Sequence, residues 1–437
     1  MNALRFDHAL PAVLAVIKQR FGEKLPATTV VRDALGMLSV VLPDEALTDA
    51  SDWQGLAVDL HRALARYSPG ESRVLLRIGD LIDPDDVVQS PDRVPLTDVP
   101  NTWLLDRLQT NQDWLRKPLT LPPPLPTAVA FSIKGGVGRT TAFALWAWHL
   151  ARLGKNVVLV DLDLEAPGVA GVLLDETRLP NYGLVDWLVE ALVGQADDFP
   201  LEECLGECAL SGDEPGRIQV LPALGKKTRE YVSKLGRCYV PTLAGENPPF
   251  VGLAERLQAL LQQLARLPAV PDAILLDARA GLHDVSSAAV TRLGAEVFMF
   301  ARDDYQSWQA YRLLFEHLRS ALSIEWGMPD EDLRWRLGMV AAQVEPTEAA
   351  RRRFVDRSYE TWSGLYDEEA DTVGATGQVF SRDDDGPHQP LFIGLDPRVR
   401  FFDLIDPLQR PDWQAISQTF EGFFERATSR LLPLEDN

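Results

Sequence analysis

The residues best suited to chemistry form a glycine-rich stretch at positions 131–141, which reads FSIKGGVGRTT. An apolar run precedes this stretch, and residues 142–153 are typical of a helix. A loop between a buried strand and a helix directs several backbone N–H groups toward one point, where they can surround phosphate oxygens. The sequence therefore predicts a phosphate-binding loop.

Individual positions in this loop have distinct expected roles. Gly135, Gly136 and Gly138 allow the backbone to turn tightly and to approach an anion without an intervening side chain. Thr140 stands where a hydroxyl holds Mg²⁺ in such loops, and Thr141 can bond a phosphate oxygen. The alternative is a glycine-rich turn that arose by chance, and the motifs further along the chain argue against it.

The spacing departs from the ordinary Gly-x4-Gly-Lys-[Ser/Thr] pattern, because Lys134 comes early and Arg139 occupies the usual lysine position. The run KGGVGRTT resembles the deviant Walker A motif of the ParA/MinD family of P-loop ATPases. The resemblance implies that ATP binds through residues 135–141, Val137 included. It also implies catalytic roles for Arg139 and for Lys134, which reaches the ATP phosphates of a partner copy in a homodimer. A guanidinium places its donors differently from an ammonium, so slow turnover is expected.

Carboxylates follow a β-branched run at residues 156–160, which continues as Asp161-Leu162-Asp163. Ligands of an open parallel sheet bind at the carboxyl ends of its strands, where these side chains are expected. The resemblance implies that this is the switch I element, in which Asp161 supports the Mg²⁺ shell and Asp163 orients or activates the attacking water. The alternative is that Asp163 only caps the following turn.

A second, mainly apolar run at residues 272–277 ends in Asp277 and is followed by Ala-Arg-Ala-Gly. The resemblance implies a Walker B strand, in which Asp277 holds Mg²⁺ through water. It also implies a switch II loop, in which Gly281 brings its backbone N–H to the γ-phosphate. The alternative is an ordinary buried strand that ends in an aspartate cap.

Two later stretches extend the resemblance to the base-binding side. Residues 337–344 resemble the strand that ends in Asn-Arg-Val, with Gln343 in the place of the asparagine that contacts adenine. Residues 391–400 resemble the Ile-Pro-x-Asp-x-Arg-Val stretch near the purine, which assigns Asp396 to the nucleotide site.

The order of the elements predicts the fold and the domains. From residue 128 onward strands and helices alternate, which predicts an α/β P-loop NTPase fold with a mostly parallel sheet and helices on both faces. Residues 1–115 are predicted to be a small α/β module, either an interaction or regulatory module or a structural cap. The proline-rich residues 116–127 are predicted to be an extended linker. Residues 128–437 would be the ATPase domain, with an insertion at about 176–250.

The composition restricts the possible partners. A formal net charge of −21 disfavours non-specific binding to nucleic acid or anionic lipid. Only the local basic run at 225–237 could bind nucleic acid, and a solvated surface is the favoured interpretation. The three cysteines indicate core thiols and a cytoplasmic protein. No apolar run could span a membrane, and the helix predicted at 413–432 lacks a lysine-rich face, so it is expected to pack internally.

These features together predict an ATPase that binds ATP and Mg²⁺. The resemblance implies a nucleotide-dependent dimerising switch that regulates an unidentified protein partner, in partition, positioning or bacterial conflict and defence. The alternative is a non-hydrolysing, nucleotide-bound scaffold or interaction protein.

Overall fold

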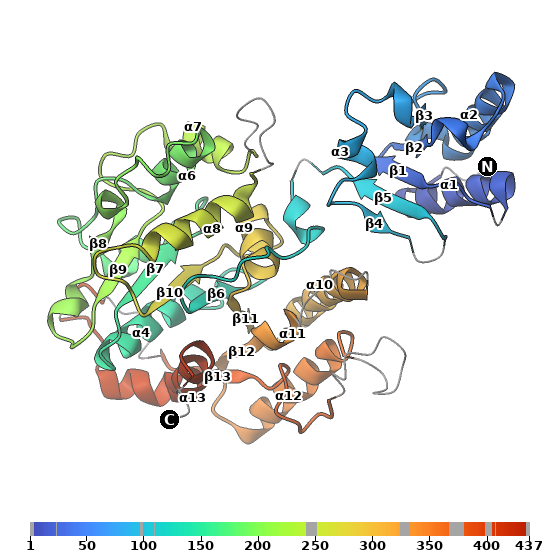
Figure 1. Ribbon diagram of the computed structural model, residues 1–437. Coiled ribbons are helices and arrows are strands. Elements are labelled where there is room, and N and C mark those ends of the chain that lie inside the picture. Colours follow the sequence, from blue (N-terminus) through green and yellow to red (C-terminus); the bar gives the residue numbers. More distant parts are fainter. Residues whose placement is uncertain are drawn as a thin grey trace. The chain divides into compact units, whose positions relative to one another are not determined.

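The computed structural model describes residues 4–22, 24–96, 99–108, 110–241, 251–323, 333–366, 380–397, 404–406 and 408–433. The chain divides into two compact units, Met1–Arg116 and Lys117–Asn437. Each unit has its own sheet (Figure 1).

Unit 1, residues Met1–Arg116, is built on a mixed five-stranded sheet with the order β3-β2-β1-β5-β4. Strands β1 and β5 are parallel, and β1 and β2 are antiparallel. The apolar stripes of two amphipathic helices pack together with the strands in one core. The elements are α1 (Phe6–Phe21), β1 (Thr28–Arg32), β2 (Leu38–Leu42), α2 (Ala50–Leu64), β3 (Leu75–Arg77), α3 (Asp85–Val88), β4 (Val94–Pro95) and β5 (Thr102–Asp106).

Unit 2, residues Lys117–Asn437, contains an eight-stranded sheet with the order β13-β12-β11-β6-β10-β7-β9-β8. Its strand pairs are parallel except for β8 with β9. The central strands are apolar and fully buried, as expected for strands covered on both faces. The strands are β6 (Thr127–Phe131), β7 (Val157–Asp161), β8 (Gly206–Glu207), β9 (Ile218–Leu221), β10 (Ala273–Asp277), β11 (Glu296–Ala301), β12 (Leu337–Val344) and β13 (Leu391–Gly394).

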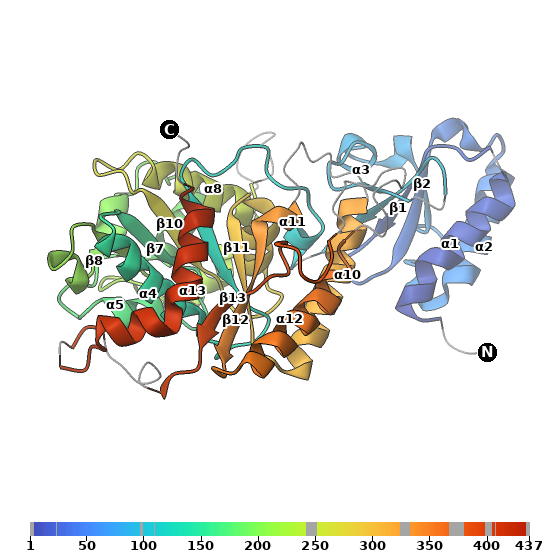
Figure 2. The ribbon, with the colours of Figure 1, turned by 90° about the horizontal axis from the view of Figure 1, so that it is seen from below.

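Helices cover both faces of this sheet (Figures 1 and 2). Helices α4, α5 and α13 pack together on one face, and α8, α9, α10 and α12 lie on the other. The predicted α/β P-loop NTPase fold is confirmed. The helices are α4 (Arg139–Arg152), α5 (Val169–Leu173), α6 (Leu184–Leu192), α7 (Tyr231–Cys238), α8 (Leu253–Leu264), α9 (Asp284–Ser287), α10 (Tyr305–Ser323), α11 (Leu333–Arg336), α12 (Glu348–Trp362) and α13 (Trp413–Leu431).

The proline-rich stretch and the insertion both belong to unit 2. The proline-rich stretch lies along the unit, because Leu119 N donates to Arg292 O at 2.9 Å and Gln258 Nε2 donates to Pro122 O at 3.0 Å. The predicted insertion contributes strands β8 and β9 to the sheet, which the sequence analysis did not anticipate. Its residues 242–250 lie outside the described part of the chain.

The basic run in the insertion makes contacts within the chain. Lys234 Nζ lies 2.5 Å from Asp186 Oδ1, and Lys226 Nζ donates to Thr177 O at 2.9 Å. Two of its positive charges are therefore used within the chain, and the choice between a solvated surface and a nucleic-acid contact stays a prediction. The three cysteines are free and buried, as predicted.

Helix α13 packs inward. Its residues Phe420, Phe423 and Phe424 are buried against α4 and the sheet, so the prediction of a packing helix is confirmed. Among the described helices, none has the length and hydropathy needed to cross a bilayer.

Candidate functional site

The glycine-rich loop connects β6 to α4, as predicted. Gly136 and Gly138 have φ values of 74° and 89°, a left-handed conformation that favours glycine at both positions. Gly138 is the N-cap of α4, so the loop ends at the amino end of a 14-residue helix. Ser132 Oγ donates to Lys134 O at 2.6 Å and holds the entry of the loop. This geometry suits the binding of phosphate oxygens by backbone N–H groups.

Two buried aspartates meet at the carboxyl ends of neighbouring strands. Asp161 ends β7, Asp277 ends β10, and the two are register partners. Their side chains are 0% and 2% exposed. Burial and the neighbouring Asp277 raise the pKa of Asp161 to about 7. Burial raises the pKa of Asp277 to about 6, although Arg139 and Thr140 oppose this shift. Like charges in a buried position favour a bound cation.

The surroundings of these aspartates fit Mg²⁺. Thr140 Oγ1 donates to Asp277 Oδ2 at 2.5 Å, and Asp277 Oδ1 is buried without a hydrogen-bond partner among the described residues. Hydroxyl and carboxylate oxygens are the ligands that Mg²⁺ prefers. The described residues contain no cluster of three His, Cys, Asp or Glu side chains that could hold a metal alone. A Mg²⁺ ion here would therefore take its remaining ligands from phosphate and water.

Asp161 also organises the loop that follows β7. Its Oδ1 accepts from Asp163 N at 3.1 Å, and its Oδ2 accepts from Gly168 N and Val169 N at 3.0 and 3.1 Å. A Cβ added to Gly168 would lie 3.8 Å from Thr140 Cγ2, so this loop passes close to the Thr140 side chain. Asp161 thus suits a supporting role around a cation.

Asp163 lies between two guanidinium groups. Its Oδ2 is 4.0 Å from Arg139 Nη2, and its Oδ1 is 4.0 Å from Arg279 Nε. Burial raises the pKa of Asp163, and Arg139 is the main opposing influence. Oδ1 also accepts from Ala166 N at 3.3 Å, which is the turn-capping contact of the alternative interpretation. The geometry is compatible with both capping and water activation.

Arg139 is directed toward the end of β10. Its side chain is 8% exposed, and Nη1 donates to the carbonyl oxygen of Ala278. The guanidinium therefore links the first turn of α4 to the segment after Asp277. The phosphate-binding role that the resemblance implies for Arg139 stays a prediction.

Lys134 forms an ion pair that the sequence analysis missed. Its Nζ lies 3.0 Å from Oδ1 of Asp304, which follows β11 and also accepts from Ser307 N at 2.8 Å. The available signal was the place of Asp304 in the chain, because an acid just after a parallel strand lies at the same edge of the sheet. Glu165, in the loop after Asp163, was also missed.

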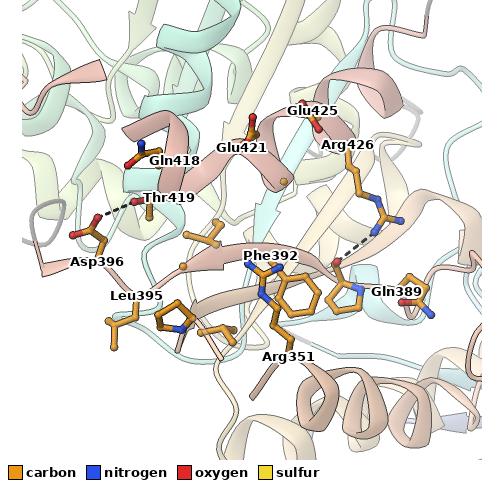
Figure 3. A pocket seen from close by; sticks show the side chains of 16 residues that line it. Arg351, Gln389, Phe392, Leu395, Asp396, Gln418, Thr419, Glu421, Glu425 and Arg426 are labelled. Atoms are coloured by element: carbon orange, nitrogen blue, oxygen red, sulfur yellow. Dashed lines mark hydrogen bonds between the residues drawn. The ribbon is translucent and has the colours of Figure 1, made fainter. Parts of the chain in front are cut away.

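The three remaining predicted residues lie in different places. Gly281 has a φ of 97° and its N–H donates to Ser132 O at 2.9 Å, which brings the segment after β10 to the phosphate loop. Gln343 Nε2 donates to Gly136 O at 3.4 Å. Asp396 accepts from Thr419 Oγ1 at 3.1 Å and lines a separate cavity of about 570 Å³ beside β13, whose lining includes none of residues 132–141 (Figure 3).

Comparisons with known proteins support the resemblance. Over 156 residues the chain is 30% identical to the septum site-determining protein MinD of Synechocystis sp., which covers 36% of this chain and 45% of MinD. Over 68 residues it is 43% identical to the chromosome-partitioning ATPase Soj of Thermus thermophilus, which covers 16% of this chain and 27% of Soj. The chain thus spans less than half the length of each relative. No protein-family model matches the sequence.

Solved structures give weaker similarities. The pNOB8 ParA structure is 18% identical, covers 70% of this chain and 98% of its own, and has a TM-score of 0.43. The MinD structure with Mg-ADP from Pyrococcus horikoshii is 19% identical, covers 70% of this chain and 100% of its own, and has a TM-score of 0.41. Similarities at this level decide neither fold nor function. The resemblance that the motifs indicated is confirmed by the sequence relatives.

Proposed function

We propose that this protein, as a relative of the ParA/MinD-type P-loop ATPases, binds ATP with Mg²⁺ and uses ATP hydrolysis to switch between a monomer and a homodimer. The switch would regulate a protein partner in partition, positioning or defence. The sequence relatives support the general class, an ATPase that acts in positioning or partition.

The observation that carries this proposal is the cation environment beside the phosphate loop. Thr140 and the unpartnered oxygen of Asp277 would hold Mg²⁺, with Asp161 in support. The backbone N–H groups of residues 135–141 would bind the phosphates. Bound Mg²⁺ would neutralise charge that develops on the phosphate oxygens.

For hydrolysis, Asp163 would orient the attacking water. The water oxygen forms the new bond to the γ-phosphorus, the bond from that phosphorus to the bridging oxygen breaks, and the water proton moves to Asp163. A raised carboxylate pKa favours acceptance of this proton. The guanidinium groups of Arg139 and Arg279 each lie 4.0 Å from the Asp163 carboxylate and stabilise its charged form.

Lys134 would connect nucleotide binding to dimerisation. In the single chain its charge is balanced by Asp304 at 3.0 Å, and both side chains are more than a third exposed. Such a pair is weak, so it can be exchanged for the phosphates of a partner's ATP. Loss of the γ-phosphate would remove that contact and release the dimer.

A nucleotide-bound scaffold with little turnover is the second candidate function. The placement of Arg139 favours it, because the guanidinium bonds to Ala278 O and would have to leave that carbonyl to reach phosphate. In that case the output of the protein would lie in unit 1 or in the insertion.

Mass measurement by light scattering separates these proposals. With Mg²⁺ and ATP, or a slowly hydrolysed analogue, we expect the native mass to double relative to ADP, and Lys134→Ala to remain monomeric. Lys155→Ala is the matched control, because this lysine pairs with Asp272 at 3.7 Å at the other end of the sheet. A mass that is independent of nucleotide would contradict the dimer switch and favour the scaffold.

A further inference from the structure

Glu165 lies at a junction of three segments. It belongs to the loop after β7, two residues beyond Asp163, and its side chain is 19% exposed. Its Oε1 receives the Arg279 guanidinium at 2.9 Å and the Tyr239 hydroxyl at 2.6 Å, and His283 Nε2 lies 3.4 Å away. Its Oε2 is buried without a hydrogen-bond partner in the described part of the chain.

The groups that meet at Glu165 come from functionally different segments. Arg279 lies two residues after Asp277 and two before Gly281, in the segment that bonds to the phosphate loop. Tyr239 directly follows α7 in the insertion. One carboxylate therefore joins the loop of Asp163, the loop of Gly281 and the insertion.

The insertion makes a second contact with the same loop. The hydroxyl of Tyr231, the first residue of α7, donates to Leu164 O at 2.5 Å. Both ends of α7 are thus bonded to adjacent residues of the loop that carries Asp163. A contact that served only to cover the ATPase unit would not need two half-buried hydroxyl bonds to neighbouring residues of this loop.

We propose that Glu165 is a positioning residue for ATP hydrolysis, through which the insertion sets the placement of Asp163 relative to Arg279 and Gly281. The inference rests on the proposed function. Glu165 does not touch the reacting atoms; it holds the two loops that do. Both loops also adjoin the phosphate loop, so bound nucleotide is expected to change the hydrogen exchange of α7 through the same two contacts.

Two conservative variants test the junction in the full-length chain. Glu165→Gln keeps the shape and removes the charge that holds Arg279, and Tyr239→Phe removes only the hydroxyl. Residues that hold catalytic groups in place are typically worth about 10- to 100-fold, so Glu165→Gln is expected to lower kcat by about 10-fold or more. Binding of a fluorescent ATP analogue with Mg²⁺ should change much less than kcat, because the phosphate contacts remain.

The second readout is hydrogen exchange of the α7 amides with and without Mg²⁺ and a non-hydrolysable ATP analogue. In the native chain the analogue should change the protection of α7, and in Tyr239→Phe this change should be lost although the analogue still binds. Tyr182→Phe is the matched control, because Tyr182 lies in the same insertion and packs its ring on Phe199. It should behave as the native chain.

The outcomes separate this inference from the proposed function. If the native chain binds no nucleotide, both are overturned. If it binds nucleotide but α7 exchange is insensitive to the analogue, or if Glu165→Gln and Tyr239→Phe match the native chain in both readouts, only the role of Glu165 is overturned. If the native chain binds ATP without hydrolysing it, the role of Glu165 in hydrolysis is overturned even where α7 exchange responds to the analogue.

Discussion

Both units of this protein place an aspartate at the end of a parallel strand, half-buried in unit 1 and buried in unit 2, and the charges of the neighbouring side chains are opposite. In unit 1, Asp106 ends β5 and its register partner on β1 is Arg32, whose Nη1 lies 2.9 Å from Asp106 Oδ2. In unit 2, Asp277 ends β10 and its register partner on β7 is Asp161. The same position in a strand pair thus holds a closed ion pair in one unit and two like charges in the other.

This difference teaches what marks a ligand site. Burial raises the pKa of Asp106 and of Asp277 alike, and each leaves one oxygen without a described partner. An unpaired oxygen therefore does not distinguish them, although Asp277 is more deeply buried than Asp106. The sign of the neighbour does, because Arg32 neutralises Asp106 within the fold, whereas Asp161 increases the need for an external cation.

The largest effect is expected from a change that removes one charge of the like-charged pair, Asp161 and Asp277. Asp277→Asn should lower ATP turnover by about 100-fold or more, because a metal ligand in phosphoryl transfer contributes several kcal/mol. The stability of the nucleotide-free protein at pH 8 should not fall, since one of two repelling charges is removed. Phosphate release and thermal unfolding measure the two quantities. Asp106→Asn, the same change in the other unit, is the control and should leave turnover unchanged.

Removing one charge from the oppositely charged pair, Arg32 and Asp106, should lower stability rather than leave it unchanged. Asp106→Asn leaves the Arg32 guanidinium, 13% exposed, without its carboxylate, which should destabilise unit 1 by about 1–3 kcal/mol. Hydrogen exchange at β1 and β5 of the full-length chain measures this loss. Replacing both partners by apolar residues, Arg32→Met with Asp106→Leu, should restore part of it. If hydrogen exchange at β1 and β5 is unchanged in Asp106→Asn, the ion pair between Arg32 and Asp106 does not stabilise these two strands.

Local sequence was sufficient to predict the central part of unit 2. The glycine-rich loop, its flanking strand and helix, and the aspartates that end β7 and β10 each depend on a short run of residues. The parallel sheet then brings Thr140 to Asp277, although they are far apart in sequence. Strands β8 and β9 were not predicted, because they are short and are stabilised by the edge of the sheet rather than by their own pattern.

Side-chain partners were the part that the sequence could not predict. The pairing of Lys134 with Asp304 and the meeting of Glu165 with Tyr239 depend on side-chain direction and on how the insertion packs. Arg139 shows the same limit, because its position in the motif suggests phosphate whereas its guanidinium bonds to Ala278 O. Site residues that belong to a local motif can be predicted from the sequence, whereas long-range side-chain hydrogen bonds cannot.

The pH dependence of stability gives the smallest and sharpest test of the comparison. The pKa of Asp161 is raised to about 7 and that of Asp277 to about 6, above the unfolded value of about 4. The folded, nucleotide-free protein therefore binds protons more tightly than the unfolded chain. The stability from these groups is full below about pH 4 and is lost as pH rises toward about 7, by roughly 1.4 kcal/mol for each pH unit by which the folded pKa exceeds the unfolded one.

Two histidines act in the opposite direction, so the test must use a difference between the native protein and a variant. Burial lowers the pKa of His149 and His388, which makes stability rise with pH near neutrality. Subtracting the unfolding free energy of Asp277→Asn from that of the native protein between pH 5.5 and 8 removes their contribution. The difference should fall with rising pH, and Mg²⁺ with ATP should reverse it because the cation requires ionised carboxylates. The difference between the native protein and Asp106→Asn should not respond to Mg²⁺ and ATP, because that variant keeps both Asp161 and Asp277. A difference that does not change with pH would mean that the carboxylates of Asp161 and Asp277 do not repel each other in the folded protein. The contrast between the two units would then not support a cation site at Asp277.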